Sequence, residues 1–177
     1  MKEKLLSQKT LYKGKILNLI YKEVQMPNGL RASREIIDHG GVIAVIPVLE
    51  NGQIVMVRQF RLAAAKITLE VPAGRMNPHE SARQAVHREL REETGYRTKK
   101  IRKLISFYPA IGYSNEKIHL FIATGLTPGE QDPDEDEMIE IEILTLKQAI
   151  SKIKAGKIID SKSILALLYT ALYELMD

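Results

Sequence analysis

The chain has 177 residues, of which 45% are hydrophobic and 27% charged, and its formal net charge is +4 at pH 7. This balance is typical of a soluble globular domain with one substantial core. The sequence contains no Cys, which excludes disulfides and a cysteine nucleophile, so a metal ion would be held by oxygen or imidazole. No apolar run is long enough to span a membrane and residues 1–6 form no secretory signal, so we expect no membrane association and a cytoplasmic location.

The charges are unevenly distributed along the chain. Residues 97–103 (RTKKIRK) are basic, whereas residues 130–142 (EQDPDEDEMIEIE) are strongly acidic. The basic run is short and has no interleaved aromatic residues, so a solvated turn after a helix explains it. We therefore expect no nucleic-acid partner.

The N-terminal part of the chain has the pattern of a β-hairpin. Residues 15–25 alternate enough to form a strand, residues 26–29 (MPNG) form a turn signal, and residues 31–38 read as the returning strand. Next, residues 41–49 carry β-branched side chains at both alternating sets of strand positions, which indicates a strand buried on two faces. A turn then leads into a strand at 54–59. Further strands are predicted at 66–71, 103–108, 117–123 and 138–144.

Three segments have helical patterns. Residues 80–94 carry apolar side chains at helical spacing, and Gly95 is suited to cap that helix. Thr145 begins a helix over 146–155 that Gly156 ends, and Ser161 or Ser163 begins another that runs to Met176. Because the strands outnumber the helices and form no regular βαβ units, the sequence predicts an α+β fold with helices packed on a mixed sheet.

Three glutamates gather on one face of the first predicted helix. Glu89, Glu92 and Glu93 stand at positions i, i+3 and i+4, so their side chains project together and repel one another. The simplest explanation for a Glu-Glu pair is that it lies on a charged helix face exposed to solvent. A bound divalent cation is the alternative, since Mg²⁺ takes one or two carboxylates together with waters and phosphates.

The spacing around these glutamates favours the cation. Gly74 is followed after five residues by Glu80, after seven more by Arg88-Glu89-Leu90, and then by Glu92-Glu93 and Gly95. This pattern resembles the box of the Nudix hydrolase family at every fixed position, although Tyr96 stands where an aliphatic residue is usual. The resemblance implies an αβα sandwich with a loop-helix-loop site that hydrolyses nucleoside diphosphates linked to another moiety.

The resemblance also implies a site for Mg²⁺ or Mn²⁺. Glu89 and Glu93 would be metal ligands, Glu92 a further ligand or a residue that holds water, and the carbonyl of Ala73 a backbone ligand. The cation would neutralise the pyrophosphate, activate a water and stabilise the leaving phosphate.

Three further residues of the box would support that site. Arg88 would orient the glutamates, and Glu80 would support the loop or act as an outer ligand. Gly74 would let the backbone approach the metal and the phosphates closely.

Beyond the box, residues 10–175 are similar to the ADP-ribose pyrophosphatase and nucleotide-sugar branch of the family. The similar motifs are Arg34-Glu35-Ile36, His39-Gly40-Gly41, residues 57–61 (VRQFR), residues 69–74 (LEVPAG) and Asp134-Glu135-Asp136-Glu137. That branch forms homodimers in which the N-terminal hairpin, here residues 1–40, helps complete the partner's substrate pocket, while residues 41–177 would form the hydrolase domain. The expected substrate is a nucleoside diphosphate sugar.

The same resemblance assigns residues to substrate binding. Arg34 and Glu35 would contact the nucleobase or its ribose, Arg61 and Glu70 the phosphate and sugar region, Glu116 the terminal sugar, and Arg58 is a weaker candidate. Each could instead be an ordinary exposed side chain.

The catalytic base of this branch usually lies outside the box, on an acidic loop before the last strand. Residues 130–140 match that loop, and aligning the strand entry assigns the base to Glu137, with Glu135 second. A carboxylate there could take a proton from the attacking water. A merely solvated acidic loop is the alternative.

Two departures from the branch concern the substrate. Ile111 stands where ADP-ribose hydrolases usually have Pro, and His39 is followed by Gly40 rather than Pro. Alternatives therefore stay open: GDP-mannose, a dinucleoside polyphosphate, an oxidised nucleotide, or a non-catalytic nucleotide sensor. The intact glutamates argue against a sensor, because a pure binder does not need like charges on one face.

Overall fold

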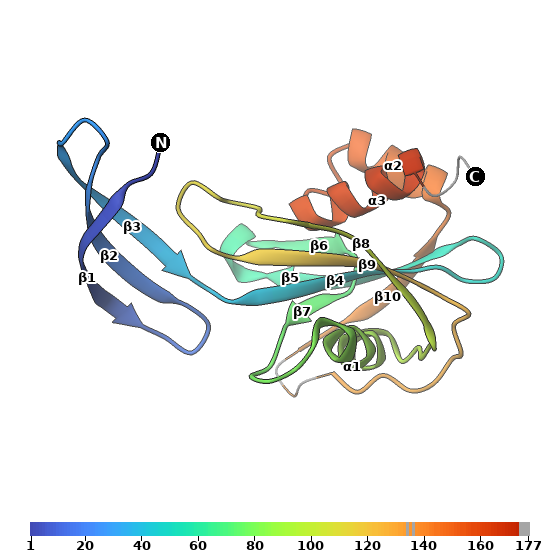
Figure 1. Ribbon diagram of the computed structural model, residues 1–177. Helices are drawn as coiled ribbons and strands as arrows, with labels where there is room; N and C mark the ends of the chain where they lie inside the picture. Colours follow the sequence, from blue (N-terminus) through green and yellow to red (C-terminus); the bar gives the residue numbers. More distant parts are fainter. Residues whose placement is uncertain (134, 136, 174–177) are drawn as a thin grey trace. The chain divides into compact units, whose positions relative to one another are not determined.

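The computed structural model describes residues 1–133, 135 and 137–173 (Figure 1). The chain divides into two compact units, one formed by residues 1–41 and 107–117 and the other by residues 42–106 and the chain from 118 onward. No helix among the described residues is long and apolar enough to cross a membrane.

The first unit is a three-stranded antiparallel sheet in the order β1-β2-β3. Its strands are β1 (Lys4–Lys13), β2 (Asn18–Gln25) and β3 (Arg31–Asp38). The predicted hairpin is confirmed as β2 and β3, joined by a turn in which Gly29 has a φ of +84°, although β2 begins three residues later than predicted. Sequence reasoning missed β1, because all ten of its residues are exposed and no alternation of buried and exposed positions marks it.

Residues 107–117 belong to this first unit and pair with the end of β3. The amide of Ile37 donates to the carbonyl of Tyr113 at 2.8 Å, and the amide of Asn115 donates to the carbonyl of Ile37 at 3.1 Å. The side chain of Asn115 also accepts from the amide of His39 at 2.9 Å. The segment is therefore fixed to β3 by backbone and side-chain hydrogen bonds.

The second unit carries the remaining sheets and, within the described residues, three α-helices. A four-stranded sheet has the order β7-β4-β9-β8, and a three-stranded sheet has the order β10-β5-β6. The strands are β4 (Gly41–Pro47), β5 (Ile54–Arg61), β6 (Lys66–Glu70), β7 (Ala73–Arg75), β8 (Lys100–Phe107), β9 (Lys117–Thr124) and β10 (Glu140–Leu144). The helices are η1 (Leu62–Ala64), α1 (Ala82–Thr94), α2 (Leu146–Lys154) and α3 (Ser161–Tyr173).

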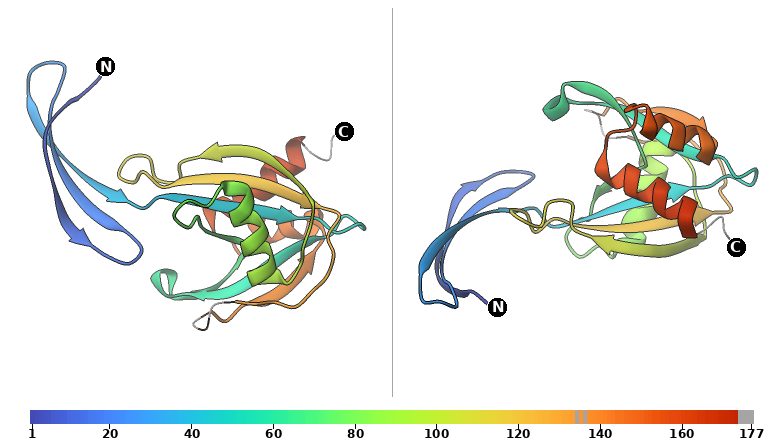
Figure 2. Two further views of the ribbon diagram at one scale, coloured as in Figure 1. Left: turned by 60° about the horizontal axis from the view of Figure 1, so that its bottom comes forward. Right: turned by 90° about the horizontal axis from the view of Figure 1, so that it is seen from above.

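Helices cover both faces of these sheets: α1 lies on one side, and α2 and α3 on the other (Figures 1 and 2). On the α1 side, Val86 and Leu90 pack with Ile43 and Phe121 in the core. On the other side, Ala166 and Leu167 of α3 are fully buried. The α+β sandwich that the sequence predicts is confirmed.

Local signals set the ends of α1. Ser81 and Gln84 form a reciprocal capping box at its N-terminus, which satisfies backbone donors that would otherwise lack a partner. Gly95 ends it in the left-handed conformation with a φ of 73°, and its amide donates to the carbonyl of Arg91. The predicted cap is confirmed, while the first helical residue is Ala82 rather than Glu80.

The remaining differences from prediction lie in short elements and at element ends. The three-residue β7 and η1 were missed, because each is too short for its pattern to be recognised. The last strand begins at Glu140 rather than Met138, whose side chain is exposed. The predicted end of the last helix, Met176, lies outside the described residues, which follow α3 to Tyr173.

Candidate active site

Two buried glutamates of α1 face strand β7. Glu89 is 9% exposed and Glu93 is 3% exposed, and Glu93 Oε2 accepts a 3.2 Å hydrogen bond from the amide of Ala73. A Cβ added at Gly74 would lie 2.0 Å from Glu89 Oε1. Strand β7 can therefore approach the helix only because residue 74 has no side chain.

Arg88 joins the glutamates to the loop before the helix. Its Nε and Nη2 each donate to Glu80 at 3.0 Å, and its Nη1 donates to Glu89 at 2.6 Å and to Glu92 at 2.9 Å. Nη2 also donates to the carbonyl of Arg75 at 2.8 Å. One guanidinium thus holds three carboxylates and the β7 backbone in a single arrangement.

Burial dominates the electrostatics of the two inner glutamates. Burial, together with the charges of Glu92 and Glu137, raises the pKa of Glu89 to about 7, although the charge and hydrogen bond of Arg88 oppose this rise. Burial followed by the charge of Glu89 raises the pKa of Glu93 well above its usual value, although the hydrogen bond from Ala73 opposes this. The surroundings of Glu89 and Glu93 therefore supply too little positive charge to offset the burial of both carboxylates.

The oxygen atoms of Glu89, Glu93 and Ala73 suit a hard divalent cation that takes only some of its ligands from the protein. No three His, Asp or Glu side chains within the described part of the chain are grouped as metal ligands. Two carboxylates and a nearby backbone carbonyl are nevertheless the kind of incomplete set that Mg²⁺ completes with water and substrate phosphates.

A second charged cluster surrounds Glu70 at the end of β6. Arg61 binds the Glu70 carboxylate with two hydrogen bonds of 2.8 Å, and Lys162 of α3 donates to it at 2.5 Å. Burial by itself raises the pKa of Glu70, but the Arg61 hydrogen bond, the charge and hydrogen bond of Lys162 and the Thr68 hydroxyl lower it to about 2. Glu70 therefore stays charged and keeps Arg61 in place.

Lys162 was missed by sequence reasoning, as was its neighbour Ser163. The fully buried hydroxyl of Ser163 accepts from the amide of Val71 at 2.9 Å and donates to Asp160 at 2.5 Å. The start of α3 thereby fixes the chain between Glu70 and Ala73. No local pattern signals these bonds, because Val71 and Ser163 are 92 positions apart.

The acidic loop begins against the C-terminal end of α1. Gln131 Nε2 donates to the carbonyl of Glu93 at 2.5 Å, and the amide of Asp132 donates to the carbonyl of Glu92 at 3.1 Å. Farther along, the charge of Glu137 acts on both buried glutamates. Glu137 is therefore close enough for its charge to affect the pKa values of Glu89 and Glu93.

Glu137 also borders a cavity of about 470 Å³, together with Phe60, Ile67, Pro133 and Met138. Glu135 is exposed. The two other acidic positions of the predicted motif, Asp134 and Asp136, lie outside the described residues.

The remaining predicted substrate residues lie at the cavity beside Glu137 or in the first unit. Arg58 lines that cavity and pairs with Glu142 of β10 at 3.1 Å, and Glu142 also pairs with Lys152 of α2. Arg34, Glu35 and Glu116 belong to the first unit, where Arg34 pairs with Glu3.

The backbone of β7 at Gly74 thus lies against two buried carboxylates of α1, in a unit whose sheets are covered by helices on both faces (Figure 2). The NUDIX domain model matches residues 38–167 of the chain. The protein therefore belongs to the Nudix family.

Two full-length relatives refine this placement. The chain is 35% identical over 179 residues to an ADP-ribose pyrophosphatase of Bacillus subtilis (strain 168), covering 100% of this chain and 97% of the relative. It is 39% identical over 174 residues to a methanol dehydrogenase activator of Bacillus methanolicus, covering 97% of this chain and 94% of the relative. A solved structure described as an ADP compounds hydrolase has the same fold, with a TM-score of 0.89 at 19% identity over 99% of this chain and 96% of that one.

Proposed function

We propose that the protein hydrolyses the pyrophosphate bond of ADP-ribose or a related nucleoside diphosphate sugar, giving a nucleoside monophosphate and a sugar phosphate. The observation that carries the proposal is the pair of buried glutamates, Glu89 and Glu93, against Ala73 and Gly74 of β7. Full-length identity of 35% to an ADP-ribose pyrophosphatase supports the substrate class.

Glu89, Glu93 and the carbonyl of Ala73 would hold the cation, Mg²⁺ or Mn²⁺, and Glu92 would add a ligand or hold a water. When bound, the cation supplies charge neutralisation at the pyrophosphate and lowers the pKa of the attacking water. Arg88 keeps Glu89 and Glu92 oriented through its hydrogen bonds to both.

Glu137 is the proposed general base. A water oxygen forms a bond to one phosphorus and the bridging P–O bond breaks, while the water's proton passes to the Glu137 carboxylate. The influence of the Glu137 charge on both buried glutamates supports this assignment over Glu135. The broken bond leaves one phosphate on the nucleoside and one on the sugar.

Arg61 is the proposed phosphate contact, because Glu70 holds it by two hydrogen bonds and its side chain remains 43% exposed. Glu70 would act with it in the sugar region. Arg34, Glu35, Glu116 and Arg58 remain candidate contacts for the nucleobase, the terminal sugar and the phosphates.

The homodimer belongs to the same proposal. An N-terminal sheet that reaches the partner's substrate pocket would give the exposed β1 a role. The cytoplasmic location stays a prediction from sequence.

The test is nucleoside monophosphate release from ADP-ribose, GDP-mannose, UDP-glucose, diadenosine polyphosphates and NADH, with Mg²⁺ and with excess chelator. We expect turnover of a nucleotide sugar that the chelator abolishes. Glu93→Gln should lower kcat at least ~100-fold, while the exposed Glu50→Gln serves as a control of equal charge change. Tight binding of one compound without turnover would instead identify a sensor.

A pair of variants tests the base separately. Glu137→Gln should lower kcat by roughly 10² to 10⁴, whereas Glu135→Gln should leave it nearly unchanged. Metal affinity, measured by isothermal titration, should stay within about twofold in both variants, because neither carboxylate is a proposed ligand. Equal losses of kcat in both variants would contradict the assignment.

A further inference from the structure

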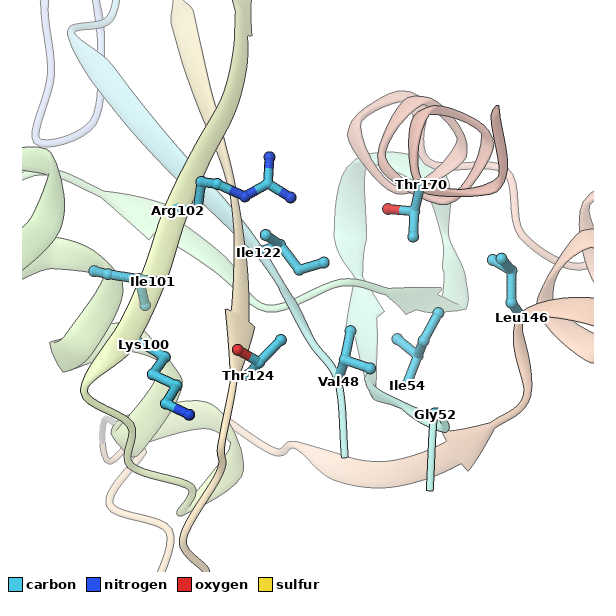
Figure 3. Close-up of a pocket in the computed structure, with 10 residues that line it drawn as sticks. All are labelled: Val48, Gly52, Ile54, Lys100, Ile101, Arg102, Ile122, Thr124, Leu146 and Thr170. Atoms are coloured by element: carbon cyan, nitrogen blue, oxygen red, sulfur yellow. The ribbon is translucent and has the colours of Figure 1, made fainter. Parts of the chain in front are cut away.

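Two kinds of hollow border helix α2. A cavity of about 430 Å³ beside Thr170 is mainly apolar, and Figure 3 shows its aliphatic side chains around a common space: Val48, Ile54, Ile122 and Leu146. Its arginine, Arg102, already has an interaction partner, and the hydroxyl oxygen of Thr170 is buried. The other hollows along α2 are, by contrast, rich in lysine.

Two hollows at the C-terminal half of α2 share Lys152 and Lys157. The first, of about 300 Å³, lies between β6 and the segment that joins α2 to α3, and Lys66 of β6 also lines it. The second, of about 450 Å³, lies along one face of α2 that includes Lys147. Because they have two lysines in common, the hollows are neighbouring parts of one surface. We call it the α2 lysine surface and define it by Lys66, Lys147, Lys152 and Lys157.

Only one carboxylate pairs with a cation of this surface among the described residues. Lys152 pairs with Glu142 at 3.0 Å, and Glu142 is also held by Arg58 at 3.1 Å. Glu140 lies opposite Arg58 on β10 and lines neither hollow. Glu142 is therefore already shared by two cations and leaves little negative charge for the rest of the surface.

The other three lysines of the surface have no counter-charge. Lys66, Lys147 and Lys157 are exposed, and within the described part of the chain their side chains form no ion pair or hydrogen bond. No aspartate or glutamate at the described positions lines either hollow. Positive charge is therefore in excess across both hollows.

The end of a helix explains part of this charge but not all of it. Cations in the last turn of a helix interact favourably with its dipole, which accounts for Lys152 and Lys154. It does not account for Lys66, which comes from β6, or for Lys147 in the first turn of α2. Two elements thus bring unpaired lysines to the same surface.

The number and kind of these groups select the ligand. Three unpaired ammonium groups across two hollows exceed what one phosphate group balances, whereas a chain of phosphates carries charge along its length. Lysine binds phosphate as a compact point charge on a flexible stem. No aromatic side chain of a described residue lines either hollow, so a nucleobase would find no ring to stack on.

We propose that the α2 lysine surface binds a short oligophosphate chain, with phosphates near Lys66 and Lys157 in the first hollow and near Lys147 in the second. The chain is held through its phosphates alone, so a nucleoside attached to it adds no affinity. Arg58 also borders the cavity beside Glu137, but the three unpaired lysines do not. The inference therefore does not depend on the proposed function.

The test is a titration of the full chain, labelled at its isoleucine methyl groups, with tripolyphosphate, ATP and inorganic phosphate at low salt with chelator. Tripolyphosphate should shift the methyl signals of Ile159, which lines the first hollow, and leave those of Ile43 and Ile122 unchanged. The expected Kd is on the order of 0.1 mM, and added NaCl should raise it. ATP should bind within about threefold of tripolyphosphate, and phosphate at least about tenfold more weakly.

Four variants locate the ligand. Lys66→Met and Lys157→Met should each raise the tripolyphosphate Kd about 3- to 5-fold, and together about tenfold or more. Lys154→Met makes the same charge change at an exposed position of α2 outside both hollows and should leave the Kd nearly unchanged. Glu93→Gln, in the candidate metal site, should also leave it unchanged, which separates this inference from the proposed function.

The proposal is overturned if tripolyphosphate leaves the Ile159 signals unshifted at about 2 mM, well above the expected Kd. Equal losses in Lys154→Met and Lys157→Met would overturn it by reducing the effect to general surface charge. Equal binding of phosphate and tripolyphosphate would contradict a chain, and much tighter binding of ATP would show that the nucleoside is recognised. Loss of the shift in Glu93→Gln would move the ligand to the candidate metal site.

Discussion

The backbone at Gly74 lies so close to Glu89 that the identity of this residue decides where the carboxylate can be. A Cβ there would come within 2.0 Å of Glu89 Oε1 and 2.1 Å of its carboxyl carbon. The glutamate is also held by Arg88, so it has little freedom to move aside. The sequence predicts that Gly74 lets the backbone approach the metal and the phosphates, which stays a prediction; the contact with Glu89 is visible only in the structure.

Gly74→Ala tests that contact. We expect the displaced Glu89 to reduce Mg²⁺ affinity and kcat roughly 10- to 100-fold, measured by isothermal titration and by monophosphate release. Gly112→Ala is the matched control for folding, because an added Cβ there meets nothing within 4 Å. Normal Mg²⁺ affinity in Gly74→Ala would show that strand β7 does not shape the site.

Glu70 links stability to pH. Its pKa of about 2 in the folded chain lies below the ordinary value of 4.5, so the folded state favours the charged form. The resulting stabilisation is present above about pH 4.5 and is lost as pH falls toward 2. A shift of this size corresponds to a free energy on the order of 3 kcal/mol.

Glu70→Gln should therefore lower the free energy of unfolding by an amount on that order at pH 7, and by much less near pH 2. Urea unfolding of both proteins across this range, with chelator present, measures the difference. Glu50→Gln, at an exposed position, provides the reference. A difference that does not change with pH would contradict the role of the Arg61 and Lys162 contacts.

At the scale of elements, α3 acts as a support for the loop that carries Ala73. Ser163, near its start, binds the amide of Val71 and is itself held by Asp160. Lys162 on the same turn binds Glu70. The helix therefore fixes two consecutive residues of the chain that leads from β6 to the candidate metal site.

Ser163→Ala should leave the buried amide of Val71 without a partner and lower the free energy of unfolding by about 1–3 kcal/mol. The loss should be measurable by urea unfolding, and kcat should fall as the loop to Ala73 loosens. Ser151→Ala, at an exposed position of α2, should change neither quantity. Full activity together with the expected instability would limit Ser163 to a role in stability alone.

At the scale of the whole molecule, the first unit has little core of its own. Among its described strand residues only Val24 is buried, and Leu5, Leu11 and Tyr12 of β1 are exposed. Exposed apolar side chains on an edge strand are a typical feature of a surface that meets another chain. This observation supports the proposed homodimer.

Sedimentation equilibrium should accordingly give twice the chain mass of 20.0 kDa. Leu5→Glu combined with Leu11→Glu should shift the protein toward monomer and raise KM for the nucleotide sugar, because charge is costly to bury in an interface. The exposed Ile159→Glu of the second unit is the control. A native chain that sediments as a monomer at all concentrations would contradict the dimer.

The sequence by itself determined the features whose signals are local. Gly95 at the end of α1, the buried strand β4 and the spacing of Glu89, Glu92 and Glu93 are each readable within one short segment, because turn chemistry and periodicity act over a few residues. The family box follows from the same local spacing. The fully exposed β1 shows the limit, since a strand without a buried face has no alternation to read.

Only the tertiary structure decided which residues meet across the fold. The bonds of Lys162 to Glu70 and of Ser163 to Val71 each span 92 positions, and the cavity beside Thr170 is formed by two sheet strands, a hairpin and two helices. Such contacts depend on how α3 packs against the sheets, and hydrophobic packing places helices without specifying, in any local pattern, which polar side chains will face one another.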